Sequence, residues 1–139
     1  MTLDFGAYVA TFQTGDDDAL LDRFFTEDAV MTTADRRIEG RTALREFLRW
    51  AHDGVREIPR PQVVVQDEGH LFAEIDMDFV CTRDRPDFPF QPMKRGEVIT
   101  VKFVAVYTLR DGRVAHLKTF RWGVGVGVTA APDYSHILA

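Results

Sequence analysis

The apolar positions of this chain repeat with a helical period in its first part. One helical stripe in residues 3–13 is made by Phe5, Tyr8, Val9 and Phe12. Gly15 ends this segment, and the acidic residues 16–18 open a second helix, since carboxylates there accept hydrogen bonds from free backbone N–H groups. The pattern therefore predicts two N-terminal helices, the second of which runs to about Phe25.

A short strand and a third helix follow. Residues 29–33 are predicted as the strand, and a polar turn then leads through Ile38 and Glu39 to Gly40. The third helix has one broad apolar face, made of Ala43, Leu44, Phe47, Leu48, Trp50 and Ala51. The sequence His52-Asp53-Gly54 ends it, because glycine suits the left-handed conformation just past a helix.

Beyond this helix the period changes to two, which is typical of strands. Pro59 and Pro61 flank the predicted start of a strand that includes residues 63–65. Residues 70–82 alternate cleanly between two faces, and residues 97–109 form the longest predicted strand.

The connections and the end of the chain complete this pattern. The stretch Arg83–Pro92 carries three prolines and several charges and is predicted as a loop. Asp111-Gly112 indicates a tight hairpin turn into a return strand at residues 114–122. Residues 123–128 alternate glycine and valine without a nucleotide-binding spacing. They are predicted as a strand extension or as an arm that covers a neighbouring subunit.

This order of elements predicts an α+β domain, with three helices packed on one face of a curved, mostly antiparallel sheet. The length of 139 residues predicts one domain over 1–139, with a core at about 5–122 and a C-terminal tail at 123–139. Eleven Phe residues are many for this length and indicate a thick core, an apolar cavity or an interface.

Charge and cysteine content narrow the class of protein. A net charge of −5 argues against nucleic-acid binding, which needs a concentrated basic surface. The single Cys81 excludes an internal disulfide and fits a reducing compartment. Without a signal-peptide pattern at the N-terminus or an apolar run of about 20 residues, we expect a cytoplasmic protein that does not enter a membrane.

Three stretches resemble a known family. They are Phe25–Val30 (FTEDAV), Gly40–Phe47 (GRTALREF) and the hairpin Phe103–Val114 (FVAVYTLRDGRV). They are similar to the nuclear transport factor 2-like superfamily, and most of all to its SnoaL-like group of polyketide cyclases and relatives of ketosteroid isomerase. The resemblance covers roughly residues 5–122. It implies an open cone around a deep apolar pocket and a homodimer formed through the outer face of the sheet.

The resemblance also carries over residue by residue. Tyr8 matches the tyrosine that donates a hydrogen bond to the developing oxyanion in ketosteroid isomerases. Their general-base aspartate falls at Thr33 and their second oxyanion donor at Ala105, so the chain is not a ketosteroid isomerase by its residues. The position of the acidic or histidine residue on the last strand of the cyclases falls at Leu117 or Thr119, which also departs from the pattern.

The register of residues 70–82 decides which chemistry remains. In one register Glu74, Asp76 and Asp78 face the pocket, where unpaired burial would cost several kcal/mol or raise their pKa values. Asp76 is then a general base, with Arg121 or His52 as its partner. In the other register Ile75, Met77 and Phe79 face the helices, and the carboxylates lie in solvent or at a dimer interface. A slip of one residue exchanges the two faces, and the sequence leaves the choice open.

Two functions stay open. The first is cofactor-independent proton transfer on a small apolar molecule, with cyclic compounds as candidates, in an isomerase, dehydratase or cyclase. The second is a non-catalytic ligand-binding or protein-interaction module. The catalytic candidates are Asp76, Tyr8 and Arg121. The candidate pocket residues are Phe12, Thr33, Trp50, Glu74, Asp78, Val101, Phe103, Tyr107, Leu117 and Thr119. The four histidines show no ligand spacing, so neither a metal nor a cofactor is expected.

Overall fold

The computed structural model describes residues 2–138. Its helices are α1 (Phe5–Thr14), α2 (Asp17–Phe24), α3 (Arg41–Ala51) and the short α4 (Ser135–Leu138). Its strands are β1 (Phe25–Thr32), β2 (Arg37–Glu39), β3 (Val55–Gln66), β4 (His70–Cys81), β5 (Val98–Arg110) and β6 (Arg113–Arg121). The predicted order of elements is confirmed, with the short strand β2 and the short helix α4 as additions.

The ends of the first two helices form as the sequence predicts. Asp4 accepts a hydrogen bond from the backbone N–H of Ala7 at 3.0 Å, and Asp16 does the same for Ala19 at 3.0 Å. Gly15 ends α1 in the left-handed conformation with φ of 81°. These caps satisfy N–H groups that have no partner inside the helix, so they fix where each helix begins.

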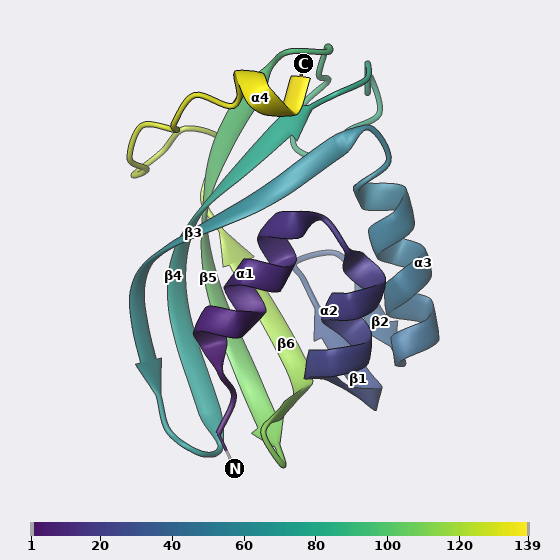
Figure 1. Ribbon diagram of the computed structural model, residues 1–139, viewed down its shortest axis with the longest axis vertical. Coiled ribbons are helices and arrows are strands. Elements are labelled where there is room, and N and C mark those ends of the chain that lie inside the picture. Colours follow the sequence, from purple (N-terminus) through teal and green to yellow (C-terminus); the bar gives the residue numbers. More distant parts are fainter. Residues whose placement is uncertain (1, 139) are drawn as a thin grey trace.

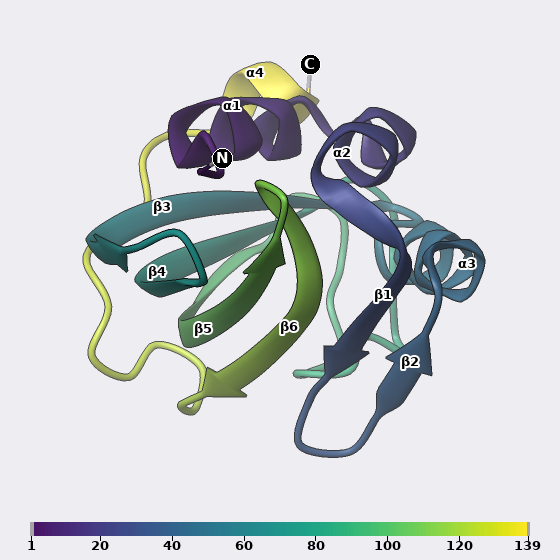
Figure 2. The same cartoon turned by 90° about the horizontal axis from the view of Figure 1, so that it is seen from below.

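The strands form one sheet in the order β2-β1-β6-β5-β4-β3. Strand β1 runs parallel to β6, and the other neighbours are antiparallel. The sheet is strongly curved, and α1, α2 and α3 lie on its concave side (Figures 1 and 2). The predicted α+β class with helices on one face of a curved sheet is therefore confirmed.

Strand β3 begins earlier than the sequence analysis expected. It starts at Val55 and passes through Pro59 and Pro61, which we had placed at the start of the strand. Proline has no N–H to donate and is therefore tolerated in an edge strand, and β3 is the edge of this sheet. The pairing with β4 shifts register between Pro61 and Val63, which relieves the local mismatch.

The register of β4 resolves the alternative that the sequence left open. Ile75, Met77 and Phe79 lie on the concave face, toward the helices. Asp76 and Asp78 therefore face the convex, outer side, which corrects the hypothesis that they enter the pocket. They do not lie in solvent either, since both are fully buried.

The C-terminal tail explains how these two carboxylates are buried. Asp76 accepts hydrogen bonds from the backbone N–H and the hydroxyl of Thr129, at 2.9 and 2.8 Å, and the Nζ atom of Lys102 lies 2.7 Å away. Asp78 accepts from Arg60 Nε at 2.7 Å, from Thr100 at 2.6 Å and from the hydroxyl of Tyr134. The tail thus replaces water around two charges that would be costly to bury unpaired.

The path of this tail corrects a second expectation. After β6 it runs across the outer side of the sheet, past β4 and β3, to α4 (Figure 2). Residues 124–127 turn rather than continue the strand, and Gly125 and Gly127 have positive φ angles of 77° and 70°. Because only glycine adopts such angles without strain, the alternation of glycine and valine encodes turns that return the tail to its own sheet. Tyr134 then packs with Ile58 and Val80.

The substitution Asp76→Asn should therefore affect stability. We expect the free energy of unfolding to fall by about 1–3 kcal/mol, because Lys102 loses its buried counter-charge. Burial alone would raise the pKa of Asp76, but hydrogen bonds from Lys102 and Thr129 hold it below 3.8. Ionised Asp76 therefore contributes stability above that pH, and the contribution is lost as the pH falls through the lowered pKa. Urea titrations at pH 7 and pH 3 measure both effects.

The control for this experiment is Glu74→Gln, on the same strand and face. The Glu74 side chain is 42% exposed, so its ion pair with Lys102 is screened by water. We expect a change within about 0.5 kcal/mol. Equal stability of Asp76→Asn and wild type at pH 7 would show that the tail is not held by this carboxylate.

Candidate functional site

A deep cavity lies between the concave face of the sheet and the three helices. Its volume is about 630 Å³, within the range of about 300–1,000 Å³ that is usual for small-molecule sites. The wall is mostly aliphatic and aromatic. Helices supply Phe12, Leu20, Leu21, Leu44, Phe47 and Leu48, and strands supply Phe25, Met31, Ile75, Met77, Phe79, Phe103, Ala105, Tyr107 and Leu117.

The loop between β4 and β5 closes part of this cavity with aromatic rings. Phe88 and Phe90 pack against Phe79, with ring centroids 5.3 and 5.0 Å from it. The buried guanidinium of Arg85 anchors the loop by donating to backbone carbonyls at the end of α3, those of Trp50 at 3.1 Å and Asp53 at 2.5 Å. The sequence predicted a loop here but gave it no place in the pocket.

Two tyrosines lie together on the buried part of the wall. The Tyr107 hydroxyl donates to the Tyr8 hydroxyl across 3.4 Å, and both residues are almost completely buried. Burial raises the pKa of Tyr107 to about 12 and that of Tyr8 well above its usual value of 10.0. Both hydroxyls therefore stay protonated at neutral pH. Each hydroxyl can both donate and accept, so the pair can still offer a proton to the oxygen of a bound molecule.

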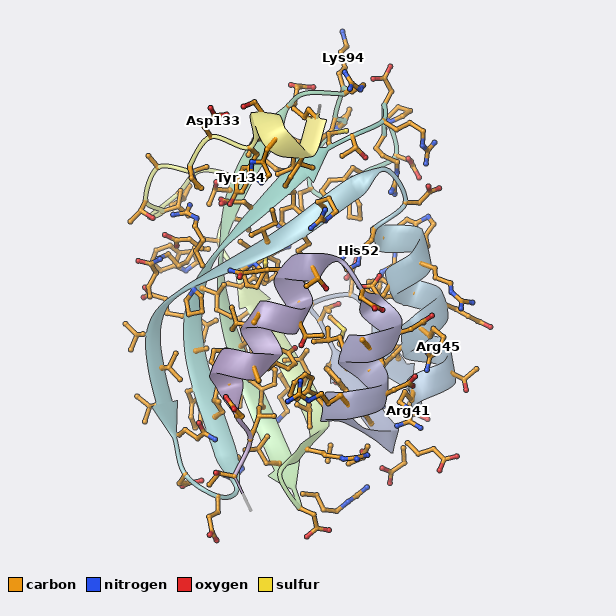
Figure 3. All side chains as sticks on the ribbon, viewed as in Figure 1. Arg41, Arg45, His52, Lys94, Asp133 and Tyr134 are labelled. Atoms are coloured by element: carbon orange, nitrogen blue, oxygen red, sulfur yellow. The ribbon has the colours of Figure 1, made fainter. Side chains whose placement is uncertain are left out.

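A carboxylate of β3 also reaches the cavity wall. Glu57 is inward-facing on β3, opposite Phe79 of β4, and its side chain is 16% exposed. Its Oε1 atom accepts from Nε2 of His52 at 2.8 Å, and Nδ1 of His52 donates to Asp17 at 2.8 Å. His52 follows α3, and Asp17 begins α2, so three elements meet in this array. Figure 3 shows His52 beside the N-terminal helices, whereas Tyr134 lies on the other side of β3.

The two carboxylates determine the charge of His52. Burial alone would lower the pKa of the imidazole, but hydrogen bonds to Asp17 and Glu57, together with their negative charges, raise it to about 10. His52 is therefore an imidazolium at neutral pH, and both ring nitrogens donate. The array of Asp17, His52 and Glu57 carries one net negative charge. We call these three residues the carboxylate–imidazolium array.

The structure places several of the predicted site residues on the cavity wall. These are Tyr8, Phe12, Thr33, Phe103, Tyr107, Leu117, Thr119 and Arg121. The guanidinium of Arg121 lies 4.5 Å from the centre of the Phe90 ring. Thr33 donates to Asp35 at 3.1 Å, beside the exposed part of the cavity.

Other predicted residues lie elsewhere. Glu74, Asp76 and Asp78 occupy the outer face of the sheet, so the proposed base Asp76 is outside the cavity. Trp50 is 39% exposed on α3, where the Arg36 guanidinium lies 5.0 Å from its ring centre. Trp50 lies three residues after Phe47, at the edge of the apolar face of α3, so its ring packs 5.9 Å from the Phe47 ring and is partly in solvent. Val101 is fully buried in the core, but its side chain is not part of the cavity wall.

The sequence pattern indicates neither Glu57 nor the second role of Asp17. Asp17 was interpreted only as part of a helix start, and Glu57 was left out because the start of β3 was placed too late. Val55, Glu57 and Pro59 are spaced two residues apart, so they lie on the same face of a strand. This spacing is the signal that could have identified Glu57 as a carboxylate on the inner face.

The charge of His52 gives a testable dependence of stability on pH. Its pKa is 6.5 in an unfolded chain and about 10 in the folded protein. A raised pKa stabilises the fold fully below pH 6.5, and this contribution is lost as the pH rises toward 10. The difference in unfolding free energy between wild type and His52→Gln should therefore be largest near pH 6 and should shrink by pH 10. Chemical denaturation at several pH values measures it.

The control for that series is His70→Gln, because His70 is exposed at the start of β4. We expect this variant to follow the wild-type curve over the same range. A constant difference between wild type and His52→Gln from pH 6 to pH 10 would contradict a buried imidazolium.

The described part of the chain contains no helix that is long and apolar enough to cross a bilayer. Within residues 2–138, no group of three or more His, Cys, Asp or Glu side chains is arranged to hold a metal ion. In the carboxylate–imidazolium array both imidazole nitrogens are already engaged, which fits this finding.

Solved structures with the same fold include proteins of different stated activities. A candidate polyketide cyclase from Xanthomonas campestris pv. campestris is 27% identical, with 83% of this chain and 84% of that chain covered and a TM-score of 0.70. A candidate polyketide cyclase from Pseudomonas putida KT2440 is 22% identical, with coverage of 86% and 91% and a TM-score of 0.72. An epoxide hydrolase of the LEH-like type from M. tuberculosis is 16% identical, with coverage of 84% and 78% and a TM-score of 0.65.

A search of curated proteins found no match. A family model, in contrast, matches most of the chain. It describes the SnoaL-like domain and covers residues 5–117, from the first helix to the cavity-lining Leu117 of β6. The chain therefore belongs to the SnoaL-like family of the nuclear transport factor 2-like superfamily.

Proposed function

We propose that this protein binds a small, mostly apolar molecule in its cavity and performs cofactor-independent proton transfer on it. Cyclic compounds are the best candidates, because flat or ring-shaped molecules match a wall built from aromatic and branched aliphatic side chains. The observation that carries the proposal is the cavity of about 630 Å³, whose mostly apolar wall includes the carboxylate of Glu57.

Proton transfer needs a group that accepts a proton and a group that stabilises the charge that develops. Since Asp76 lies outside the cavity, Glu57 takes the position of the acceptor in this proposal. Tyr8 stays protonated and so can donate a hydrogen bond to an oxygen of the substrate. Isomerisation, dehydration and cyclisation all use such a pair of groups.

The alternative is a binding module without catalysis. It is favoured by one observation: the three carboxylates of β4, which the sequence offered as bases, do not reach the cavity. The two functions differ at Glu57, because catalysis requires its carboxylate whereas binding of an apolar molecule requires mainly the volume. A cytoplasmic location, expected from the single cysteine, stays a prediction.

Blocking the cavity tests ligand binding. Ala105 faces the cavity from β5 and is 3% exposed, so a larger side chain there occupies ligand space. In wild type, a ring compound at about 100 times its Kd should stabilise the fold by about 2.7 kcal/mol, which raises Tm by several degrees. Ala105→Trp should lose this shift. Thermal unfolding with a panel of small aromatic and alicyclic compounds measures it.

The matched control is Val104→Trp, because Val104 is the next residue along β5 and lies on the outer face. This variant should keep the ligand-induced shift. If no compound stabilises wild type, or if Ala105→Trp responds as wild type does, the cavity is not the binding site. Circular dichroism of both variants checks that the fold is intact.

We also propose a homodimer formed through the outer face of the sheet. The part of this face that the tail leaves uncovered has a group of exposed apolar side chains: Val63, Val65, Phe72, Val104, Phe120 and Trp122. We call this group the outer apolar patch. Phe120 and Trp122 are 59% and 57% exposed. Large aromatic residues gathered on one face are typical of surfaces that bind another protein chain.

Gel filtration with light scattering tests the dimer. We expect a dimer at micromolar concentration for wild type and a monomer for Phe120→Asp, since a charge in the patch must be desolvated on association. Trp50→Gln is the control, because Trp50 is an exposed aromatic residue on α3, away from the sheet face. A monomeric wild type at micromolar concentration would contradict the proposed interface.

A further inference from the structure

Glu57 has unused hydrogen-bonding capacity on the side of the cavity. Its Oε1 atom accepts from His52 at 2.8 Å, whereas Oε2 accepts no hydrogen bond from any group within residues 2–138. Glu57 is one of the residues that line the cavity, and Oε2 is its oxygen without a hydrogen-bond partner among the described residues. An ionised carboxylate has only lone pairs to offer, and its complement is therefore a hydrogen-bond donor.

The position of His52 indicates what kind of donor fits. The imidazolium lies 2.8 Å from Glu57, so a positive charge is already present beside this carboxylate. A ligand ammonium placed on the same carboxylate would meet a like charge at close range, and such pairs are unfavourable. A neutral donor avoids this repulsion and still gains a hydrogen bond to a charged acceptor, which is stronger than one to a neutral group.

The neighbouring side chains complete this part of the cavity. The Phe12 ring lies between Tyr8 and His52, with centroids 6.1 Å and 6.3 Å from their rings. This places the Tyr8 hydroxyl, which pairs with the Tyr107 hydroxyl, on the same part of the wall as the array. A hydroxyl on the ligand is the simplest neutral group that can bond to both residues, since it can donate to Glu57 and accept from Tyr8.

We propose that Glu57 makes the cavity selective for apolar ring compounds that carry a hydroxyl, with Asp17 and His52 as the residues that position its carboxylate. This inference rests on the proposed function, because it assumes that the cavity binds small apolar molecules. It adds the chemical class of the ligand and the atom that recognises it. A cavity that hydrogen-bonds a ligand hydroxyl discriminates strongly against analogues without it, since its own polar group is then left unpaired.

A series of naphthalene compounds tests this proposal on the unmodified protein. The probes are 2-naphthol, 2-methoxynaphthalene, naphthalene and 2-naphthylmethylamine, and isothermal titration calorimetry measures Kd for each. 2-Methoxynaphthalene keeps the oxygen but cannot donate, so it tests whether the ligand donates a hydrogen bond in the cavity. We expect 2-naphthol to bind roughly tenfold more tightly than 2-methoxynaphthalene and also more tightly than the amine.

Two leucine variants connect the difference to one carboxylate. In Glu57→Leu the preference for 2-naphthol over 2-methoxynaphthalene should fall to about one, while naphthalene binds at least as well as before. Glu74→Leu removes a carboxylate from the outer face and should keep the wild-type ratio. If Glu57→Leu does not fold, the ligand series in wild type still decides the question.

The outcomes separate this inference from the proposed function. If none of the four compounds binds, the proposed function itself is wrong for ligands of this size, and the selectivity is overturned with it. If naphthalene, 2-methoxynaphthalene and 2-naphthol bind equally, the cavity binds apolar molecules but Glu57 does not select a hydroxyl. Tighter binding of the amine would show that the array prefers a cation.

Discussion

The register of β4 against its two neighbours determines what this protein can hold on each side of its sheet. Pairing with β3 and β5 turns Ile75, Met77 and Phe79 to the concave face and the alternating carboxylates to the convex face. A slip of one residue would exchange these sets, filling the cavity with charge and exposing the apolar side chains. Burial of the apolar set against three helices makes the observed register strongly favourable.

This register places Asp76 and Asp78 on the outer face, where the tail supplies hydrogen-bond donors to both carboxylates. Asp76 and Asp78 are fully buried, and their oxygens are occupied by side chains of β3 and β5 and by Thr129 and Tyr134 of the tail. The tail is therefore part of the fold rather than an appendage. It also divides the outer face into a covered polar part and an uncovered apolar part, which is where we place the proposed dimer contact.

The fold follows from the sequence because its signals are local. Helix caps at Asp4 and Asp16, the apolar stripe of α3 and the Asp111-Gly112 turn each act within a few residues. The same locality explains the error at β3. Proline normally argues against a strand interior, and only the position of β3 at the sheet edge, a property of the whole sheet, allows Pro59 and Pro61 within it.

The site was less predictable because its polar groups come from distant parts of the chain. Asp17, His52 and Glu57 belong to three elements, and no spacing in the sequence links them. Phe88 and Phe90 lie in a proline-rich loop, where nothing in the sequence pattern shows which rings turn inward. The carboxylates of β4 are conspicuous in the sequence, but their partners Thr129 and Tyr134 lie in the C-terminal tail, where no pattern indicates a contact with the sheet.

The carboxylates of the cavity and of the outer face differ in how completely they are paired. On the outer face Asp76 and Asp78 are paired with cations and with hydroxyls of β5 and the tail, which makes them structural. On the concave face Glu57 is held by His52 from one side only, so part of its capacity remains for a ligand. A buried carboxylate with all its lone pairs occupied stabilises the fold but has nothing left to bind. The proton transfer that we propose for the cavity therefore depends on Glu57, the carboxylate that the fold leaves partly unsatisfied.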